Sequence, residues 1–422
     1  MKIKQVAVLG ANGIMGSRIA TMIAKEESIT VYMIARNHNK INHNKKSELN
    51  STERLVYADY SQAAQILSHS DWIIEAVAED LTIKKKINKI IAKHAKKDCI
   101  ISTTTSSLSV QELSKSFDSQ ARKYYFGAHF FNPPQIVRLC ELILTSYSNT
   151  QTASKLKSFL QNVLERKVIV ARDTPGFIAN RIGFQLINEA AQAAQKYANL
   201  GGVAYVDLLL GACTGRAMAP LATLDYIGLD THQAICENIY KYTCDDARNT
   251  FIVPDYLKRL ISQNKLGRKT NGGLYKIKQL PNGTKQKLTY DIETQTYRQF
   301  PKKTNSLTAQ MELLMREEKY IEAFEVVKKT KEEGSIIKHF LARYISYSFS
   351  MIGNVVDDID SVDQAMINGF FWAPPTMHVQ LLGGVKETIK LLQKENVTVP
   401  NSLQTWQQKA SNKQNYSDYF RV

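Results

Sequence analysis

The sequence predicts an α/β domain built on an open sheet over residues 1–173, followed by an all-α region. Two observations predict the first part. Short apolar runs alternate with segments of helical periodicity, and a glycine-rich turn follows the first run. A third observation predicts the second part, because strand-like runs give way to long helical patterns after Asp173-Thr174-Pro175-Gly176.

The first predicted strand, residues 4–9, leads into a glycine turn and a helix that reaches about Lys25. This order favours a dinucleotide-binding turn, since N–H groups at a helix N-terminus can approach a pyrophosphate. The spacing is GxxGxxG, one residue longer than the usual fingerprint, and a plain tight turn is the alternative. The candidate cofactor-binding residues here are Gly10, Asn12, Gly13, Ile14, Met15 and Gly16.

The second predicted strand, residues 30–34, ends in Ala35-Arg36 rather than in an acidic residue. An acidic residue at this point commonly binds the adenosine ribose of NAD, whereas an arginine can accept the 2′-phosphate of NADP. Arg36 is therefore a candidate cofactor-binding residue, and both cofactors stay open. The alternatives are that it stacks on adenine or points to solvent. Residues 37–53 are polar and predict a loop or a frayed helix.

The remaining pattern of the first domain predicts six more strands and three helices. Carboxylates at the end of the strand over residues 72–77 can face a ribose or a nicotinamide, but we interpret Asp80 as the cap of the next helix. The expected strands cover residues 55–58, 72–77, 99–102, 124–128, 139–144 and 168–171, and the expected helices cover 62–67, 81–94 and 150–164.

Polar residues that end or interrupt three of these strands form the candidate active site. The strand over residues 99–102 stops at a run of threonines and serines, 103–107, and the strand over 124–128 stops at His129. Glu141 lies twelve residues later, inside an apolar run. Because ligands of an open α/β sheet bind outside the carboxyl ends of its strands, His129 and Glu141 suggest a general base and its orienting partner.

The second part begins with a proline–glycine break and a long apolar helix. We expect Thr174 to cap this helix, Pro175 to occupy its first position, and Asn180 to lie in its first turn, with the helix ending near Tyr197. Residues 279–299 form a polar insert. A faint echo between the segments that start at Asp207 and Asp363 divides the region into two helical units, 174–300 and 301–422, the second a degenerate repeat of the first or a chance likeness.

Composition narrows the class of protein. The 422 residues are 44% hydrophobic and 22% charged, as in soluble globular proteins, and no apolar run is long enough to predict a membrane span. Five scattered cysteines predict neither a disulfide framework nor a metal site, so we expect a reducing cytoplasm. We interpret the net charge of +16 as solvated surface first, as a site for a phosphate-bearing substrate second, and as nucleic-acid binding a distant third.

Taken together, these motifs resemble the 3-hydroxyacyl-CoA dehydrogenase family. The resemblance covers about residues 1–277 well and 335–390 weakly, and the order and separation of the motifs make it specific. It rests on Gly13-Ile14-Met15-Gly16, on Ile74 to Leu81 with Lys84, on Thr105-Ser106-Ser107-Leu108, on Gly127 to Pro133, on Glu141, on Asp173 to Arg181, on Thr214-Gly215-Arg216, on Asp225 to Asp230 and on Gly267 to Tyr275.

The resemblance implies a Rossmann-like domain that binds NAD, a helical domain that commonly forms a homodimer, and oxidation of a 3-hydroxyacyl-CoA to the 3-oxoacyl-CoA. It implies that His129 removes the hydroxyl proton, that Glu141 holds the imidazole, and that Ser106 and Asn180 bind substrate oxygens. It adds Ala78, Glu79, Lys84 and Ser106 to the candidate cofactor-binding residues. The implied small-molecule partner is an acyl-CoA, with no nucleic acid and no membrane span, and the implied role is fatty-acid β-oxidation or short-chain acyl-CoA metabolism.

Three departures from the family pattern keep alternatives open. Thr104 replaces the usual asparagine, the second strand lacks its acidic end, and residues 37–53 are too short for the family's helical arm that helps hold CoA. The first two leave NAD or NADP open. The third leaves open a dehydrogenase of a 3-hydroxy acid without CoA. A catalytically idle cofactor-binding protein with a basic docking surface is the remaining alternative.

Overall fold

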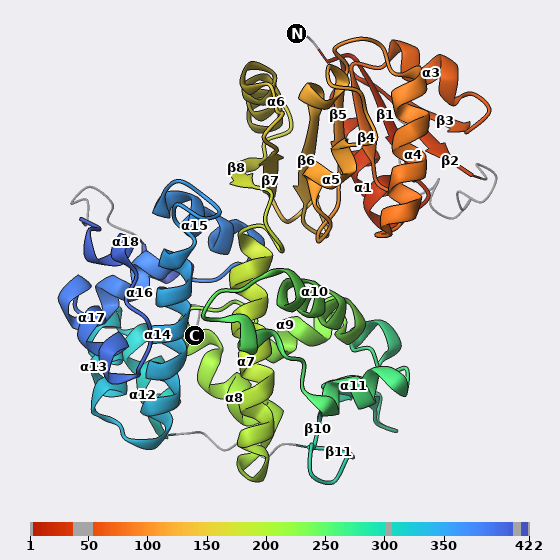
Figure 1. The fold of residues 1–422 in the computed structure, drawn as a ribbon. Coiled ribbons are helices and arrows are strands. Elements are labelled where there is room, and N and C mark those ends of the chain that lie inside the picture. The colour runs from red at the N-terminus through yellow and green to blue at the C-terminus, as the bar shows by residue number, and fades with distance from the viewer. Residues whose placement is uncertain (1–2, 37–53, 300–305, 408–414, 421–422) are drawn as a thin grey trace. The chain divides into compact units, whose positions relative to one another are not determined.

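The computed structural model describes residues 3–36, 54–299, 306–407 and 415–420 (Figure 1). The chain forms two compact units, residues 1–177 and 178–422. The domain limits that we predict, 1–173, 174–300 and 301–422, stay predictions. No helix among the described residues is long and apolar enough to cross a membrane.

The first unit is built on an eight-stranded sheet in the order β3-β2-β1-β4-β5-β6-β7-β8. The strands β1 to β6 are parallel, β7 runs antiparallel to β6, and β8 is parallel to β7. The strands are β1 (Gln5–Leu9), β2 (Thr30–Ala35), β3 (Leu55–Asp59), β4 (Trp72–Glu75), β5 (Ile100–Thr103), β6 (Tyr125–Phe130), β7 (Leu139–Leu144) and β8 (Lys167–Arg172).

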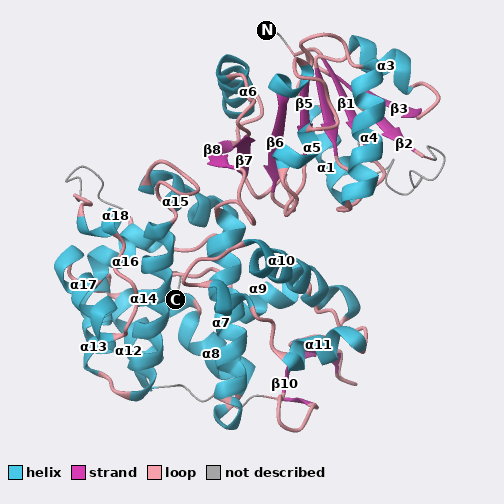
Figure 2. Cartoon of the chain, in the orientation of Figure 1, coloured by secondary structure: helices cyan, strands magenta, loops and turns pink. Residues whose placement is uncertain are grey.

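Helices cover both faces of this sheet (Figure 2). On one face, Ile19 and Ile23 of one helix and Leu156 and Leu160 of another share a core with Trp72 and other strand residues. On the opposite face, three further helices pack against β1, β4 and β6. The first pair is α1 (Ile14–Ile23) and α6 (Thr150–Asn162), and the second group is α3 (Ala63–His69), α4 (Leu81–His94) and α5 (Val110–Ser114).

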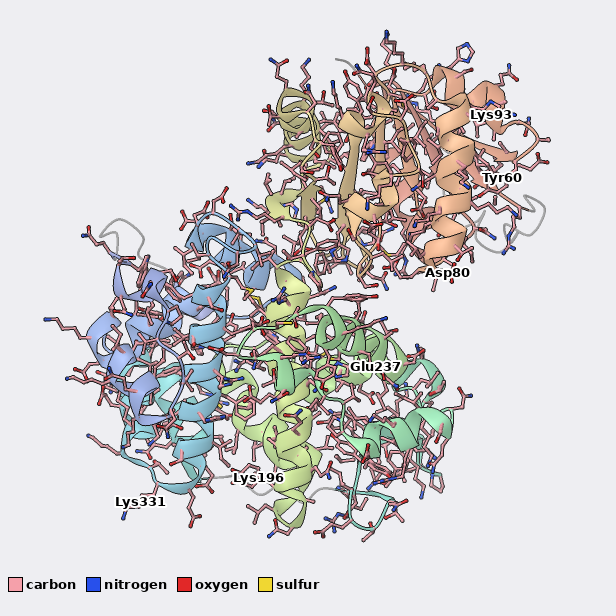
Figure 3. All side chains as sticks on the ribbon, in the orientation of Figure 1. Tyr60, Asp80, Lys93, Lys196, Glu237 and Lys331 are labelled. Atoms are coloured by element: carbon pink, nitrogen blue, oxygen red, sulfur yellow. The ribbon has the colours of Figure 1, made fainter. Side chains whose placement is uncertain are left out.

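The structure confirms the predicted Rossmann-like arrangement and most strands and helices of the first unit. Asp80 caps α4 as predicted, with its carboxylate accepting the Ile83 N–H at 2.8 Å, and lies at the opposite end of the helix from Lys93 (Figure 3). The prediction that a strand stops at His129 is wrong. The strand β6 continues to Phe130 because His129 pairs with Glu141 across the antiparallel ladder.

The predicted start of the long helix is also wrong. The helix α7 (Ala179–Lys196) begins with Ile178 as its N-cap rather than Thr174, although Asn180 does lie in its first turn. Gly176 and Phe177 have φ angles of +75° and +50°, which no right-handed helix allows, so residues 174–177 form a turn.

The described part of the second unit is helical apart from a small antiparallel sheet that includes the polar insert and begins just before it, which we did not predict. This sheet contains β9 (Tyr275–Gln279), β10 (Lys285–Tyr290) and β11 (Tyr297–Arg298). Buried residues line almost the full length of α7, which contacts α8, α9, α10 and α14. The first set of helices comprises α7, α8 (Gly202–Leu210), α9 (Pro220–Ile227), α10 (Leu229–Tyr242) and α11 (Asp255–Ser262).

A second set of helices follows in the same order. Two short helices, α12 (Ser306–Arg316) and α13 (Tyr320–Lys329), precede it. The second set comprises α14 (Glu332–Ser350), α15 (Ile359–Ala365), which continues into η7 (Met366–Phe370), α16 (Pro375–Leu381), α17 (Val385–Lys394) and α18 (Asn401–Gln404). The short 3-10 turns are η2 (Ala121–Tyr124), η3 (Ala198–Leu200), η4 (Ala212–Thr214), η5 (Arg248–Phe251), η6 (Arg268–Thr270) and η8 (Tyr416–Asp418).

Matching positions in the two sets are separated by a constant shift. Asp363 follows Asp207 by 156 residues, and each carboxylate accepts N–H bonds at the start of a helix that has proline in its first turn. Gly384 follows Gly228 by the same 156 residues, and both are N-caps with positive φ. These matches support the predicted repeat.

Candidate active site

His129 and Glu141 are neighbours because of strand register. They face each other directly in the antiparallel pair β6 and β7, where opposed side chains on one face of a sheet approach closely. His129 Nδ1 lies 2.5 Å from Glu141 Oε2, and both side chains are buried. A carboxylate in this position accepts the Nδ1 proton, so Nε2 keeps its lone pair and can take up another proton.

Ser106 lies on the other side of the imidazole. Its hydroxyl is 3.0 Å from His129 Nε2, which places serine, histidine and glutamate in one line of hydrogen bonds. The rings of Phe131 and Phe177 lie 4.5 Å and 5.5 Å from the imidazole ring. An apolar wall on a base limits its contact with water and keeps the free Nε2 directed toward Ser106.

Glu79 holds the loop that presents Ser106. Its Oε1 accepts hydrogen bonds from the Thr105 hydroxyl at 2.7 Å, from the N–H groups of Ser106 and Ser107 at 2.9 Å each, and from the Ser107 hydroxyl at 2.9 Å. Burial acts to raise the pKa of Glu79, but the Lys84 ammonium and these donors together hold it below its ordinary value. Glu79 is therefore a charged anchor for the loop.

Lys84, a predicted cofactor-binding residue, is enclosed by protein. Its ammonium lies 2.9 Å from Glu75 Oε1 and 3.5 Å from Glu79 Oε2, and the side chain is 1% exposed. Glu75 also accepts the Thr103 hydroxyl at 2.7 Å and the Val77 N–H at 2.8 Å. In this structure Lys84 and Glu75 join the end of β4 to α4 and β5.

The glycine turn has the form of a phosphate cradle. A Cβ atom on Gly10 would lie 2.6 Å from the Ala76 carbonyl oxygen, and one on Gly16 would lie 2.6 Å from the Gly10 carbonyl oxygen, so both positions require glycine. Gly13 is the N-cap of α1 and provides no side-chain acceptor, which leaves N–H groups at the helix start for an anion. The residues present therefore fit a dinucleotide pyrophosphate.

The other predicted cofactor-binding residues lie around the start of α1 and beyond the ends of β2 and β4. Ile14, at the start of α1, is 62% exposed although it is apolar, Asn12 is exposed, and Met15 is partly buried against the core. Arg36 follows β2 with an exposed side chain. Ala78 is exposed in the turn between β4 and α4, where its carbonyl accepts the Asp80 N–H at 2.8 Å.

Asn180 belongs to the second unit. It is buried, with 6% of its surface exposed, and lies in the first turn of α7. Within the part of the second unit that the structure describes, we find no hydrogen-bond partner for its side-chain amide. A side-chain amide without a protein partner is available to a ligand.

Sequence reasoning did not single out Asn132 as a site residue. It lies two residues after the end of β6, before a cis bond to Pro133, and its side-chain oxygen accepts a hydrogen bond from Arg18 of α1. This contact joins the end of the strand that carries His129 to the helix of the glycine turn. The signal was present in the Phe-Phe-Asn-Pro run, which we read only as part of a family motif.

Comparison of the sequence with models of known protein families identifies the family to which the chain belongs. Residues 5–174 match the family model described as 3-hydroxyacyl-CoA dehydrogenase, NAD binding domain, and residues 176–277 match the model of the C-terminal domain of the same family. The chain belongs to the 3-hydroxyacyl-CoA dehydrogenase family. The match to the NAD binding domain gives NAD(H) as the cofactor of the first unit.

Relatives of this 3-hydroxyacyl-CoA dehydrogenase family member differ in length. A probable 3-hydroxyacyl-CoA dehydrogenase of Bacillus subtilis (strain 168) is 29% identical over 434 residues, which cover 94% of this chain and 53% of the relative. The chain thus spans about half the length of that relative. A probable 3-hydroxyacyl-CoA dehydrogenase of Deinococcus radiodurans is 32% identical over 293 residues, 65% of this chain and 83% of the relative.

The fold of a solved family structure extends over nearly the whole chain. The crystal structure of 3-hydroxybutyryl-CoA dehydrogenase from Escherichia coli aligns with a TM-score of 0.68 and 19% identity, and the match covers 93% of this chain and 94% of that one. This likeness includes the second set of helices, which the family models do not reach.

Proposed function

We propose that this protein oxidises a 3-hydroxyacyl-CoA to the 3-oxoacyl-CoA with NAD⁺, and catalyses the reverse reaction with NADH, in fatty-acid β-oxidation or short-chain acyl-CoA metabolism. The observation that supports the proposal most strongly is the line of hydrogen bonds from Ser106 through His129 to Glu141, inside a domain of this family. A base with one ring nitrogen held by a carboxylate and the other beside a hydroxyl is suited to taking a proton from an alcohol.

The roles of the residues follow from this geometry. His129 Nε2 accepts the proton of the substrate hydroxyl, and Glu141 stabilises the imidazolium that forms. NAD⁺, when bound, accepts the hydride that leaves C3. Ser106 donates to the substrate oxygen beside Nε2, and Asn180 donates to a second oxygen of the substrate. The alcohol thus loses one proton to His129 and one hydride to the cofactor, which together convert it to the ketone.

The binding roles are part of the same proposal. The turn of Gly10, Gly13 and Gly16 would hold the pyrophosphate of NAD, with Asn12, Ile14 and Met15 beside it, and Arg36 and Ala78 would lie along the ribose and adenine side. Glu79 would act on the cofactor and also hold Ser106, while Lys84 would act through Glu79. The segment that we judge too short for the family's CoA-holding arm, residues 37–53, lies outside the described residues.

The test is a spectrophotometric assay of acetoacetyl-CoA reduction at 340 nm. We expect oxidation of NADH that depends on the CoA ester, slower oxidation of NADPH, and no reaction with free acetoacetate. A reaction with free acetoacetate and none with the ester would support the dehydrogenase of a free acid. Absence of turnover with each combination, from folded protein that still binds NADH, would support the idle cofactor-binding protein.

Two further statements belong to the proposal. We place the protein in a reducing cytoplasm, which agrees with five free cysteines, four of them buried. We also expect a homodimer, as the resemblance implies, and light scattering on the purified chain tests this by its mass. A monomer of 47.7 kDa would contradict it.

A further inference from the structure

We propose that Tyr347, in the second set of helices, is a positioning residue for Asn180 in the first set. The inference rests on the proposed function, because it takes Asn180 to be a substrate ligand. Tyr347 lies near the end of α14, whereas Asn180 lies in the first turn of α7. The two helices pack against each other.

A buried hydrogen-bonded triangle connects the two helices. Arg181 Nε donates to the Tyr347 hydroxyl at 2.8 Å, and Arg181 Nη2 lies 2.6 Å from Asp245 Oδ2. The Tyr347 hydroxyl donates to the same Asp245 oxygen at 2.9 Å, so each member contacts the other two. Tyr347 and Arg181 are 6% and 8% exposed. A guanidinium buried to this degree requires such partners, which fixes where it lies.

The triangle lies at the start of α7, the helix that carries Asn180. Ile178 occupies the N-cap position of α7 and makes no side-chain capping bond of the kind that serine, threonine or asparagine provides. Arg181 is the next residue after Asn180 in this turn. A clamp on Arg181 therefore fixes the backbone that carries the unpaired amide of Asn180.

The two helical sets are paired by an approximate two-fold relation, which provides an internal comparison. Arg216 forms an antiparallel β-bridge with Trp372, which is the residue 156 positions later in the chain. We call two residues that are separated by this shift mates. On either side, Ala217 N–H donates to the Phe371 carbonyl at 3.3 Å, and Ala373 N–H donates to the Gly215 carbonyl at 2.7 Å. The same shift exchanges these two bonds, because it relates Ala217 to Ala373 and Gly215 to Phe371.

This relation exposes an asymmetry at the triangle. The mates of Arg181 and Tyr347 are Ile337 and Ala191, and both are buried and apolar. At the equivalent position of the two-fold pair, the two helices are therefore held together by apolar packing rather than by hydrogen bonds. The polar triangle occurs only on the side that carries Asn180, where substrate binding requires a precise backbone position. We infer that the triangle fixes this position.

The test compares Tyr347→Phe with Tyr344→Phe. Both changes remove one buried hydroxyl from α14, but the Tyr344 hydroxyl donates to the Ala373 carbonyl and does not touch Arg181. We expect Tyr347→Phe to lower kcat/KM for acetoacetyl-CoA about tenfold, with the KM for NADH unchanged. Tyr344→Phe should leave both values near those of the wild type. Equal effects of the two variants would overturn the proposal.

Two further measurements separate positioning from a general loss of structure. In an Asn180→Ala background, Tyr347→Phe should cause no additional loss of kcat/KM, whereas additive losses would contradict an action through Asn180. Hydrogen exchange of amides 179–184 should be faster in Tyr347→Phe, and in Asp245→Asn as a second variant, than in Tyr344→Phe. This readout needs no turnover. Inactive wild-type protein would refute the proposed function, and unchanged exchange would refute the positioning role.

Discussion

At the level of single residues, the proposed chemistry depends on one cross-strand pair. Glu141 faces His129 because β7 runs antiparallel to β6 in a sheet that is otherwise parallel up to that point. The imidazole therefore receives its partner from the adjacent strand, and its other nitrogen is directed to Ser106. A change of one residue in register would turn Glu141 to the opposite face of the sheet.

Glu141→Gln tests the charge of this partner. The amide keeps the shape of the side chain but cannot stabilise an imidazolium, so we expect kcat to fall by about 10² or more while the KM for NADH stays constant. Glu112→Gln is the matched control, because Glu112 is an exposed glutamate paired with Lys115. If Glu141→Gln turns over like the control, the partner role assigned to Glu141 is wrong.

Arg36→Ala tests how the cofactor is selected. If Arg36 accepts a 2′-phosphate, its removal should lower kcat/KM with NADPH about tenfold and leave kcat/KM with NADH unchanged. The same assay at 340 nm measures both values. An unchanged ratio of the two would mean that Arg36 only faces solvent or stacks on adenine.

The sequence allowed a prediction of the pairing of His129 with Glu141, and the family resemblance added Ser106 and Asn180, but the contact of Ser106 with His129 was not predicted. Residue type and the position of each side chain on a strand suggested a base and its partner. The hydrogen bond between the Ser106 hydroxyl and His129 Nε2 depends on how Glu79, after β4, holds the loop that follows β5. The periodicity of the sequence does not indicate this loop conformation. The same holds for Lys84, whose place in a buried ion pair depends on Glu75, a residue nine positions earlier.

At the level of elements, the loops after β4 and β5 form one polar unit. Glu75 and Lys84 are buried and bonded to each other, and Glu79 connects them to the loop of Ser106. A buried charge that loses its partner is costly, because water cannot replace the lost interaction. The position of Ser106 therefore depends on the ion pair between Glu75, at the end of β4, and Lys84, in α4.

Lys84→Met tests this dependence. We expect the free energy of unfolding in urea to fall by about 3–5 kcal/mol, because Glu75 would be left buried without its cationic partner. Lys86→Met, on an exposed position of the same helix, should change it by less than about 0.5 kcal/mol. Equal stability of the two variants would show that the buried pair contributes little.

Element types were easier to predict than element limits. Apolar runs and helical periodicity located the strands of the first unit, and its α-helices except the short α5, to within a few residues. The start of α7 was misplaced, because the Thr-Pro-Gly sequence looks like a helix start, whereas the left-handed backbone at Gly176 and Phe177 continues the turn. The small sheet β9 to β11 was missed, since its strands are mostly exposed and lack an apolar face.

At the level of the whole molecule, the helical unit combines two similar sets whose mates carry different chemistry. The faint echo between residues 207 and 363 was visible in the sequence. The pairing of Arg216 with Trp372 was not, because it depends on tertiary contacts between distant segments. Both echo positions hold buried aspartates, and burial raises the pKa of Asp207 to about 6 and that of Asp363 to about 7.

Asp363→Asn tests the effect of this burial on stability. Because the folded chain holds the pKa of Asp363 above its ordinary 3.8, it binds the proton more tightly than the unfolded chain. The resulting stability is complete below about pH 4 and is lost as the pH rises through about 7. Asparagine does not ionise, so Tm of the variant relative to the wild type should rise between pH 5 and pH 8.

Asp255→Asn, at an exposed position in the first turn of α11, provides the control, with no such rise expected. A Tm difference for Asp363→Asn that does not change with pH would contradict the raised pKa.

The measurement that tests the central claim most directly is the rate of NADH formation from (S)-3-hydroxybutyryl-CoA and NAD⁺ by the wild type and by His129→Gln. We predict turnover by the wild type and a kcat lower by about 10²–10⁴ in the variant, with NAD⁺ binding and circular dichroism unchanged. Equal turnover by the two proteins would contradict the assignment of His129 as the base.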